Sequence, residues 1–407
     1  MINLKKIISL TNQNEAYVID KRRSIHQNPE LSFQEENTSK LVIRELDNLG
    51  LEVEEGIAGT GIVATLQGKG EGKTVLLRAE MDALPISEEA DVFFKSSKPG
   101  VMHACGHDVH TANLLGVAKI LASLKEEFDG TVKFMFQPGE EKGGGCKKML
   151  EDKVLERHPV DMAMALHIMP IRAGEILISA GNITAYSDGF LIEVYGKSAH
   201  SSRPEEGIDA INIAAHIVVG LNSIISRKID PRDTATLSVG TVEGGRSNNI
   251  ISDHVVLRGI VRSSSEKVRN TIREQISDIS KGIAAAYGGS STVKINEGYP
   301  SIINNQALTE LITNSFTQNY MEFIRDIDDD IYRTKFSTKW VIPHRPLLTA
   351  DDFAFIAKRV PSVYYLIGTG DHAPGHSSKF FVDEKYIKLC TRTMVLGALE
   401  LLEVKGF

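Results

Sequence analysis

The sequence predicts an α/β fold: one domain with a mostly parallel central sheet, interrupted by a smaller inserted α+β domain of ferredoxin-like type. Strand-like runs alternate with helical segments in the first part of the chain, and this alternation resumes after Gly298-Tyr299-Pro300. Between these parts, from near Tyr186, the expected order is β-α-β-β-α-β. Strands separated by helices favour a parallel sheet. We therefore expect one α/β domain built from residues 1–185 and 299–407, with residues 186–298 inserted.

The elements of the α/β domain follow from apolar periodicity and from the residues that end helices. A helix is expected over residues 34–49, where Gly50 stops it. A long apolar-rich helix is expected over 108–127, and a terminal helix near 384–402. The expected strands are 61–67, 74–79, 131–136 and 161–166.

The inserted domain shows the same two periodicities in a different order. Its expected helices cover residues 207–227 and 265–287. Its expected strands are 187–196, 234–241, 253–262 and 291–297. This succession is typical of a ferredoxin-like unit.

Composition and charge narrow the classes of function. The chain has 407 residues, of which 42% are hydrophobic, and a formal net charge of -7. An acidic chain has no general attraction for nucleic acid or anionic membrane, so we expect neither as a partner. No run approaches the roughly 18 apolar residues that span a bilayer. Cys105, Cys146 and Cys390 are odd in number and far apart, which indicates reduced thiols in the cytoplasm.

The densest chemical signal is the run His103-Ala-Cys105-Gly-His107-Asp108-Val-His110, which precedes and begins an expected helix. Thiolate and imidazole are the preferred ligands of zinc-like cations. Cys105 and His107 are two residues apart in a non-helical segment, so they can converge on one ion. The structural alternative is that Asp108 caps the helix and the histidines are incidental.

A second signal is the pair of carboxylates in Gln137-Pro-Gly-Glu140-Glu141, on a glycine-rich loop after an expected strand. Neighbouring side chains outside a helix point in different directions. One carboxylate can therefore bind a metal while the other acts as a base toward a water molecule. Taken alone, such a pair is more often a solvated surface feature.

Three histidines complete the pattern. His167 ends an apolar strand, His376 belongs to His372-Ala-Pro-Gly-His376, and His200 lies on a polar loop of the inserted domain. Each alone would more often be structural or simply exposed. Four of the five signals lie at strand ends or loops of the α/β domain, where ligand sites of open parallel sheets gather.

Taken in order, these motifs resemble the zinc-dependent aminoacylase/carboxypeptidase amidohydrolases, in the branch of hippurate hydrolases, indoleacetyl-amino acid hydrolases and N-acetyldiaminopimelate deacetylases. The resemblance runs from about Arg22 to Leu402. It implies a metallopeptidase-like catalytic domain, with the inserted domain as a lid and dimerisation domain. The matching motifs are His26-Gln-Asn-Pro29-Glu30-Leu-Ser-Phe33-Gln-Glu35, Arg78-Ala-Glu80-Met-Asp82-Ala-Leu-Pro85, HACGHD, QPGEE, His167, Gly196 to His200, and His376 to Glu384.

The resemblance also implies roles for individual residues. Glu140 is the expected general base, and His200 is the expected lid histidine that holds the developing oxyanion. Asp82 is expected to orient a ligand histidine, and Asn249 is expected near the substrate. The implied metal ligands are Cys105, His107, Glu141, His167 and His376.

The implied reaction is hydrolysis of an amide bond in a small N-acyl amino acid or dipeptide-like substrate, by a water activated at two divalent metal ions. Zinc is the expected metal, with manganese, cobalt or nickel as alternatives. The resemblance also implies a homodimer, or a tetramer. A catalytically inactive metal-binding protein of the same fold is the alternative, but such a protein would usually lose Glu140 or several ligands. A two-metal phosphatase or nuclease is a further class, and its sites favour aspartates.

Three features depart from the family's pattern. Glu80 stands where an aspartate is more common, and Thr349-Ala-Asp351-Asp352-Phe353 stands where Gly-Ser-Glu-Asp-Phe is common. The acidic stretch from Asp326 to Asp330 has no match, so its role is not predicted. None of these features removes an expected ligand or the expected base.

Overall fold

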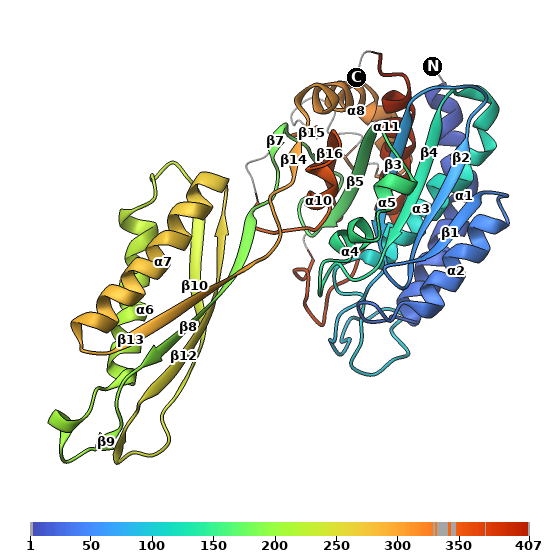
Figure 1. Cartoon of the computed structure of the whole chain (residues 1–407). Helices are drawn as coiled ribbons and strands as arrows, with labels where there is room; N and C mark the ends of the chain where they lie inside the picture. The colour runs from blue at the N-terminus through green and yellow to red at the C-terminus, as the bar shows by residue number, and fades with distance from the viewer. Residues whose placement is uncertain (1–2, 329, 332–340, 343–346, 371, 406–407) are drawn as a thin grey trace. The chain divides into compact units, whose positions relative to one another are not determined.

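The computed structural model describes residues 3–328, 330–331, 341–342, 347–370 and 372–405. The chain divides into two compact units (Figure 1). The first comprises Met1–Ile183, Ile303–Arg345 and Asp352–Phe407, and the second comprises Thr184–Ile302 and Pro346–Asp351. The second unit therefore includes a short segment from late in the chain, which the sequence did not indicate.

The first unit is built on an eight-stranded mixed sheet with the order β1-β2-β4-β3-β5-β16-β6-β15. The central strands β4, β3, β5 and β16 are parallel to their neighbours within this group, as predicted. The strand bounds are β1 Glu52–Ile57, β2 Gly61–Gln67, β3 Thr74–Glu80, β4 Thr131–Gln137, β5 Met162–Met169, β6 Ile176–Leu177, β15 Val341–Ile342 and β16 Ser362–Gly368.

Helices cover the central strands, which explains why these strands are apolar along their length. All residues of β16 are buried, and so are all but the first residue of β3. Helices α3 and α11 pack on β3 and β5, and α1 packs on both of these helices. The helix bounds are α1 Leu4–Gln27, α2 Glu36–Asp47, α3 His107–Ser123, α4 Gly145–Glu151, α5 Val154–Arg157, α8 Gln306–Ile324, α10 Ala354–Ala357 and α11 Ile387–Leu402.

Helix α1 lies where no helix was predicted, and α8 lies in the part after residue 300 for which alternating helices and strands were predicted without bounds. In α1 the reason is that Arg22 and His26 are buried, so polar side chains interrupt the apolar stripe. Burial is tolerated because both residues have partners. Arg22 donates to Asp108 (2.7 Å), and His26 pairs with Asp108 (2.9 Å) and Glu88 (3.0 Å).

The chain leaves and re-enters the first unit at neighbouring points. The short strand β7 (Gly181–Asn182) pairs antiparallel with β14 (Ile303–Asn304). At the base of the second unit, the hydroxyl of Ser301 donates to the carbonyl of Thr184 (2.6 Å), and Ile302 N donates to the Thr184 hydroxyl (2.9 Å). The two ends of the insertion are thus held together on both sides of the junction.

The second unit has the predicted β-α-β-β-α-β order, in an antiparallel sheet arranged β10-β12-β8-β13. Helices α6 and α7 pack against this sheet and share one apolar core with it. By length and composition alone α6 could cross a membrane, but its apolar stripe, with Ile213, Ile217 and Leu221, is buried in that core. The bounds are β8 Tyr186–Tyr195, α6 Ala210–Arg227, β10 Ala235–Gly244, β12 His254–Ser263, α7 Glu266–Ala286 and β13 Ser290–Glu297.

The acidic stretch without a predicted role is tied to the C-terminal helix. Asp326 accepts two hydrogen bonds from the fully buried guanidinium of Arg392 on α11 (2.6 and 2.8 Å). Asp328 accepts from Lys385 and from the hydroxyl of Tyr386 (both 2.8 Å). Asp329 lies outside the described residues. The stretch therefore anchors the segment after α8 to α11.

The pair Asp326–Arg392 leads to a prediction about stability and pH. Burial alone would raise the pKa of Asp326, but the hydrogen bonds from Arg392 outweigh it and lower the pKa to about 2. A lowered pKa stabilises the fold above the unfolded value of about 3.9. We expect Asp326→Asn to lower the free energy of unfolding by about 1–3 kcal/mol at pH 7, a discounted value because Asp326 is partly exposed.

The measurement is the thermal unfolding midpoint across pH. The difference in midpoint between Asp326→Asn and wild type should narrow as the pH falls below about 4. It should vanish near pH 2, where Asp326 takes up its proton in the folded protein. The exposed Asp330 on the same segment is the control, and Asp330→Asn should have little effect. Equal effects of the two substitutions at pH 7 would contradict the anchoring role.

Candidate metal centre

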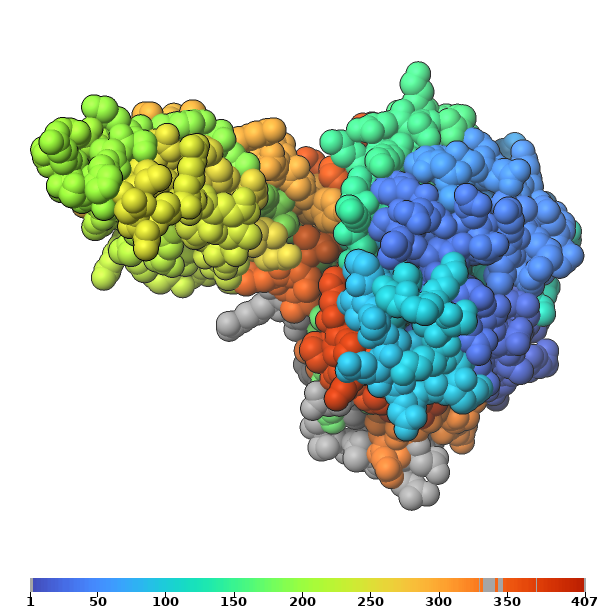
Figure 2. Space-filling model, turned by 90° about the horizontal axis from the view of Figure 1, so that it is seen from below, coloured from blue at the N-terminus to red at the C-terminus, as the bar shows by residue number. Residues whose placement is uncertain are grey.

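Most of the predicted site residues of the first unit, ligands and catalytic carboxylates alike, lie at or just after the ends of parallel strands. Asp82 lies just after β3, Glu140 and Glu141 follow β4, and His167 lies near the end of β5. His376 follows β16. Carboxyl ends of parallel strands meet at one edge of a sheet, so these residues converge there. Figure 2 shows the chain from below, with the segment around residues 85–100 in light blue to cyan. Glu89 in this segment accepts a hydrogen bond from the hydroxyl of Ser378 (2.9 Å), two residues after His376.

Cys105, His107 and Glu141 form the centre of this cluster. Each offers one ligand atom, and the three atoms lie within 4.8 Å of one another. Gly106, between the first two, has a φ of +86°. A Cβ at that position would lie 2.4 Å from Cδ1 of Ile168. Glycine therefore permits the tight turn that directs Cys105 and His107 to the same point at the start of α3.

Hydrogen bonding places the proton of His107 on Nδ1. This nitrogen donates to the backbone carbonyl of Asp82 (2.9 Å) and lies 3.3 Å from Oδ1 of the Asp82 carboxylate. Nε2 is buried and has no hydrogen-bond partner among the described residues. Burying a nitrogen lone pair without a hydrogen-bond donor costs free energy. An imidazole that binds a metal presents such a lone pair to the ion. Asp82 thus orients His107 mainly through its backbone carbonyl oxygen, which is closer than its carboxylate.

His167 and His376 extend the cluster on two sides. His167 Nδ1 donates to the carbonyl of Ile168 (2.6 Å), and its Nε2 lies 3.5 Å from Sγ of Cys105. His376 Nε2 lies 3.1 Å from Oε1 of Glu141, and this contact raises the pKa of His376. Contacts therefore link all five predicted ligands.

His110 lies beside the cluster, but hydrogen bonds engage both of its ring nitrogens. Nδ1 donates to Glu80 (3.0 Å), and Nε2 accepts the backbone N–H of Ile168 (3.0 Å). Its ring centroid lies 4.5 Å from that of His167. His110 is close enough to Glu80, His107 and His167 to form a metal group with them, but its nitrogens are occupied. It therefore supports His167 by packing.

The composition of the cluster fits divalent cations. A thiol, three imidazoles and a carboxylate are the donors that zinc-like ions prefer. Burial raises the pKa of the Cys105 thiol, so a thiolate at this position requires a positive charge beside it. A structural tetrahedral ion takes four ligands, and five converge here.

The loop that follows β4 is held by its backbone. Glu141 N donates to Oδ2 of Asp82 (2.9 Å), which also accepts the hydroxyl of Ser32 (2.7 Å). Burial alone would raise the pKa of Asp82, but the interaction with His107 and these hydrogen bonds lower it. Asp82 is therefore a carboxylate at neutral pH. Glu140, the predicted base, is buried on this loop, with 8% of its surface exposed.

A buried network around Arg78 supports this edge of the sheet. Arg78 pairs with Glu80 (2.5 Å) and with Asp352 (2.7 Å), and it donates to Gln137 (2.8 Å). Gln137 and the backbone N of Cys146 also donate to Asp352 (2.8 and 2.9 Å). The sequence reasoning assigned these residues no role. The available signal was an arginine inside the apolar strand TVLLRAE.

The two predicted lid residues belong to the second unit, where they lie side by side. The short strands β9 (Ala199–His200) and β11 (Ile250–Ile251) pair, with His200 opposite Ile250. Ser201 N donates to the carbonyl of Asn249 (3.0 Å). Both His200 and Asn249 are exposed. The structure thus brings these two residues together at one tip of the unit.

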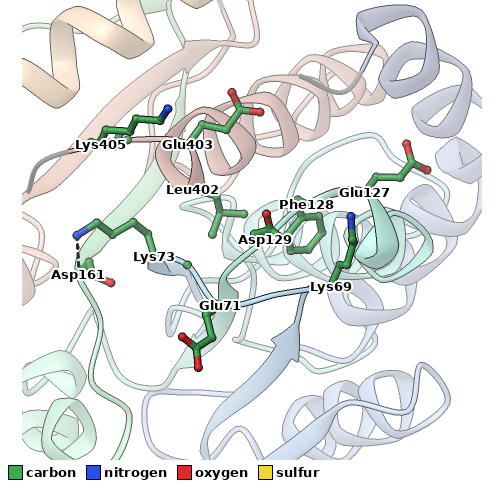
Figure 3. A pocket seen from close by; sticks show the side chains of 12 residues that line it. Lys69, Glu71, Lys73, Glu127, Phe128, Asp129, Asp161, Leu402, Glu403 and Lys405 are labelled. Atoms are coloured by element: carbon green, nitrogen blue, oxygen red, sulfur yellow. Dashed lines mark hydrogen bonds and ion pairs between the residues drawn. The ribbon is translucent and has the colours of Figure 1, made fainter.

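A surface hollow of about 840 Å³ lies at the other end of the parallel strands (Figure 3). Lys73 precedes β3, Asp129 precedes β4 and Asp161 precedes β5, and all three line it. Lys73 pairs with Asp161 (3.3 Å). The hollow contains none of the predicted site residues, so it is separate from the candidate metal centre.

The fold and the cluster together define a class of protein. Open α/β sheets bind ligands at the carboxyl ends of their strands. A set of thiol, imidazole and carboxylate donors at that edge, with a buried glutamate beside it, is the site of a metal-dependent hydrolase.

Comparisons with known proteins give the family. Residues 76–399 match the model of peptidase family M20/M25/M40. The chain is 39% identical to thermostable carboxypeptidase 2 of Saccharolobus solfataricus, over 98% of each chain. It is 36% identical to hippurate hydrolase of Campylobacter jejuni, over 90% of this chain and 91% of that protein.

Among solved structures, a dinuclear metal-binding M20 peptidase from Bacillus subtilis matches with a TM-score of 0.81 and 30% identity, over 96% of this chain and 99% of that one. The chain belongs to peptidase family M20/M25/M40. Its class is therefore that of metal-dependent enzymes that cleave amide bonds, as the sequence motifs implied.

The Arg78 network leads to a prediction about the support of this site. Arg78→Met leaves Glu80 and Asp352 as fully buried carboxylates without their guanidinium. We expect the free energy of unfolding to fall by about 3–5 kcal/mol. Urea unfolding measures this, and Arg44→Met is the control because Arg44 is an exposed arginine paired with Glu45. Comparable losses in both variants would contradict the role given to Arg78.

Proposed function

We propose that this chain hydrolyses the amide bond of a small N-acyl amino acid or dipeptide-like substrate, with two divalent cations and Glu140 as general base. The observation that carries this proposal is the set of five contact-linked ligand residues beside the loop of Glu140. Relatives named for hippurate hydrolysis and carboxypeptidase activity support the substrate class. A screen of N-acyl amino acids and dipeptides with metal-reconstituted protein tests it, and no turnover of any of them would contradict it.

The proposed cofactor is a pair of divalent cations. Five converging ligands are more than one tetrahedral ion uses, which supports two ions. Thiolate and imidazole donors favour zinc, with manganese, cobalt or nickel as alternatives. When bound, the cations lower the pKa of a water molecule and stabilise negative charge on the substrate carbonyl. The proposed ligands are Cys105, His107, Glu141, His167 and His376.

The two adjacent glutamates receive different roles. The Glu141 carboxylate contacts the ligand residue His376, whereas Glu140 precedes it on the same loop. Successive side chains outside a helix point in different directions, so one can face the cations and the other the attacking water. We assign Glu140 to accept the proton of that water and to deliver it to the leaving nitrogen. Asp82 holds the ring of His107 and the backbone of Glu141 in place.

The tautomer of His200 supports its assignment to the oxyanion. Its Nδ1 accepts the backbone N–H of Ser202 (3.2 Å) and lies 2.7 Å from the Ser202 hydroxyl. The proton of the neutral ring is therefore on Nε2, which is the donor that a developing oxyanion needs. Asn249 lies beside His200 and is proposed to contact the substrate.

We also propose that the second unit is a lid that pairs two copies of the chain into a homodimer, with a tetramer as the alternative. β10 is an edge strand ten residues long, and in the described sheet it pairs with β12 alone. An exposed edge of this length is a template for pairing. Helix α6, which packs next to β10, exposes Ile211 and Val219. We also propose a cytoplasmic location, because Cys105, Cys146 and Cys390 form no disulfide bond with one another.

The division of roles between the glutamates gives a prediction. Glu140→Gln should keep about two ions per chain and lose most turnover, because only the base is removed. Glu141→Gln should instead bind fewer ions, because a ligand is weakened. Elemental analysis and turnover per bound ion, in parallel on both variants, measure this. The division is wrong if both variants lose metal equally and keep wild-type turnover per ion.

The position of His200 on the second unit gives a further prediction. We propose that each active site takes its ligands and Glu140 from one chain and His200 from the other. His200→Ala and Glu140→Gln should each be nearly inactive alone. In mixed dimers both defects fall in one site and the other site is intact, so random pairing should restore roughly a quarter of wild-type activity.

This complementation requires two measurements. Turnover is followed after the variants are mixed and re-associated, and heterodimer formation is verified with differently tagged chains. Each variant that is dissociated and re-associated with itself is the control, and it should stay inactive. A monomeric protein, or verified heterodimers without activity, would show that His200 does not serve the partner's site.

A further inference from the structure

A buried carboxylate from the N-terminal motif reaches the loop of Glu140. Glu35, at the start of α2, has no exposed surface. Its Oε1 accepts the backbone N–H groups of Phe33 and Gly139 (both 2.9 Å), and its Oε2 accepts the hydroxyl of Thr60 (2.7 Å). Glu35 therefore joins three segments of the first unit, and one of them is the loop after β4.

The aromatic ring of Phe33 packs against the same loop. Phe33 has a φ of +63°, which is uncommon for a residue with a side chain. A Cβ on Gly139 would lie 2.4 Å from Cζ of Phe33, and one on Gly143 would lie 3.0 Å from its Cε2. Lys148 follows this loop in the sequence, and its Nζ lies 3.5 Å from the centroid of the Phe33 ring. A strained residue held by its surroundings is a frequent feature of functional sites.

The two backbone N–H groups that flank Glu140 are thus both bound to buried carboxylates. Gly139 N donates to Glu35 (2.9 Å), and Glu141 N donates to Asp82 (2.9 Å). These bonds fix the Pro138–Gly139 and Glu140–Glu141 peptides, and the carbonyl of Gly139, in the peptide between them, accepts the N–H of Gly145 (3.0 Å). The direction in which the Glu140 side chain leaves the backbone is therefore fixed as well. Asp82 also contacts the ligand residue His107, whereas the hydrogen bonds of Glu35 come from Phe33, Gly139 and Thr60, which are not proposed ligands.

We propose that Glu35 is a positioning residue for Glu140: it holds the N–H of Gly139 so that the Glu140 carboxylate faces the attacking water. This inference rests on the proposed function, in which Glu140 is the base. A general base acts only within hydrogen-bond reach of the proton that it takes, and a misplacement of about 1 Å can cost about a hundredfold in rate.

The test compares Glu35→Ala with Glu35→Gln. The alanine variant removes the acceptor of Gly139 N–H, and we expect kcat to fall about ten- to hundredfold. KM and the number of ions per chain should stay at wild-type values, because the ligands are untouched. Glutamine keeps one oxygen for both N–H groups and offers its amide to the Thr60 hydroxyl, which can accept it. Glu35→Gln should therefore restore most of kcat.

Glu30 provides a matched control in the same motif. It is also a buried glutamate, but its carboxylate accepts the backbone N–H groups of Asn37 and Thr38 (both 2.9 Å) at the start of α2. Glu30→Ala should lower the thermal midpoint and leave kcat of the folded enzyme unchanged. If Glu30→Ala and Glu35→Ala lower kcat equally, the positioning role is overturned.

A second readout needs neither metal nor substrate. Hydrogen exchange of the loop 138–144 in the metal-free chain should be about tenfold faster in Glu35→Ala than in wild type, because the Gly139 N–H loses its acceptor. Glu35→Gln and Glu30→Ala should leave this exchange unchanged. Unchanged exchange in Glu35→Ala, or normal kcat in that variant at full metal content, overturns the inference.

The double variant separates a failure of this inference from a failure of the proposed function. If Glu35 acts through Glu140, then adding Glu35→Ala to Glu140→Gln should not lower the residual kcat further. An additional loss overturns the positioning role and leaves the base assignment intact. Full turnover by Glu140→Gln alone overturns the base assignment, and with it the role of Glu35.

Discussion

The constraint on which the first unit depends is that charges placed inside an α/β sheet must be matched. Arg78 lies in the middle strand β3, and its guanidinium pairs with Glu80 and Asp352, which are themselves fully buried. Removing ions from water is costly unless each has a partner in good geometry. The network meets this condition across β3, the end of β4 and the start of α10. It thereby fixes the edge of the sheet from which the ligand residues project.

The histidines of the site show how hydrogen bonds select ligands from a group of similar side chains. His107 and His167 both donate Nδ1–H to backbone carbonyls, which directs Nε2 toward the cluster. His110 also lies close to His107 and His167, but hydrogen bonds engage both of its ring nitrogens, so it is not a proposed metal ligand. A carboxylate acceptor could itself take up a proton as the pH falls, whereas a backbone carbonyl cannot. The acceptors that set the tautomers of His107 and His167 therefore do not change with pH.

Much of the fold was predictable because its central strands and the inserted unit have regular periodicity. Helix α1 was missed because Arg22 and His26 lie on its buried side and break the apolar pattern. The candidate site was predictable where residue types are unusual for a loop, as in Cys105 and His107. Glu35 was not predictable in its role: nothing in a local sequence pattern shows that a glutamate lies against Gly139, more than a hundred residues further along the chain.

The pairing of β7 with β14 has a consequence for how such a chain can arise and fold. Asn182 lies opposite Ile303, so the residues that precede and follow the insertion already form a hairpin-like ladder. A chain lacking the insertion could close this ladder with a short turn. The entropy of closing a loop grows only with the logarithm of its length, so lengthening that turn into a whole domain raises the cost of closure far less than in proportion to the residues added. The arrangement allows a module with its own apolar core to be carried between two paired strands of the first unit without disturbing their register.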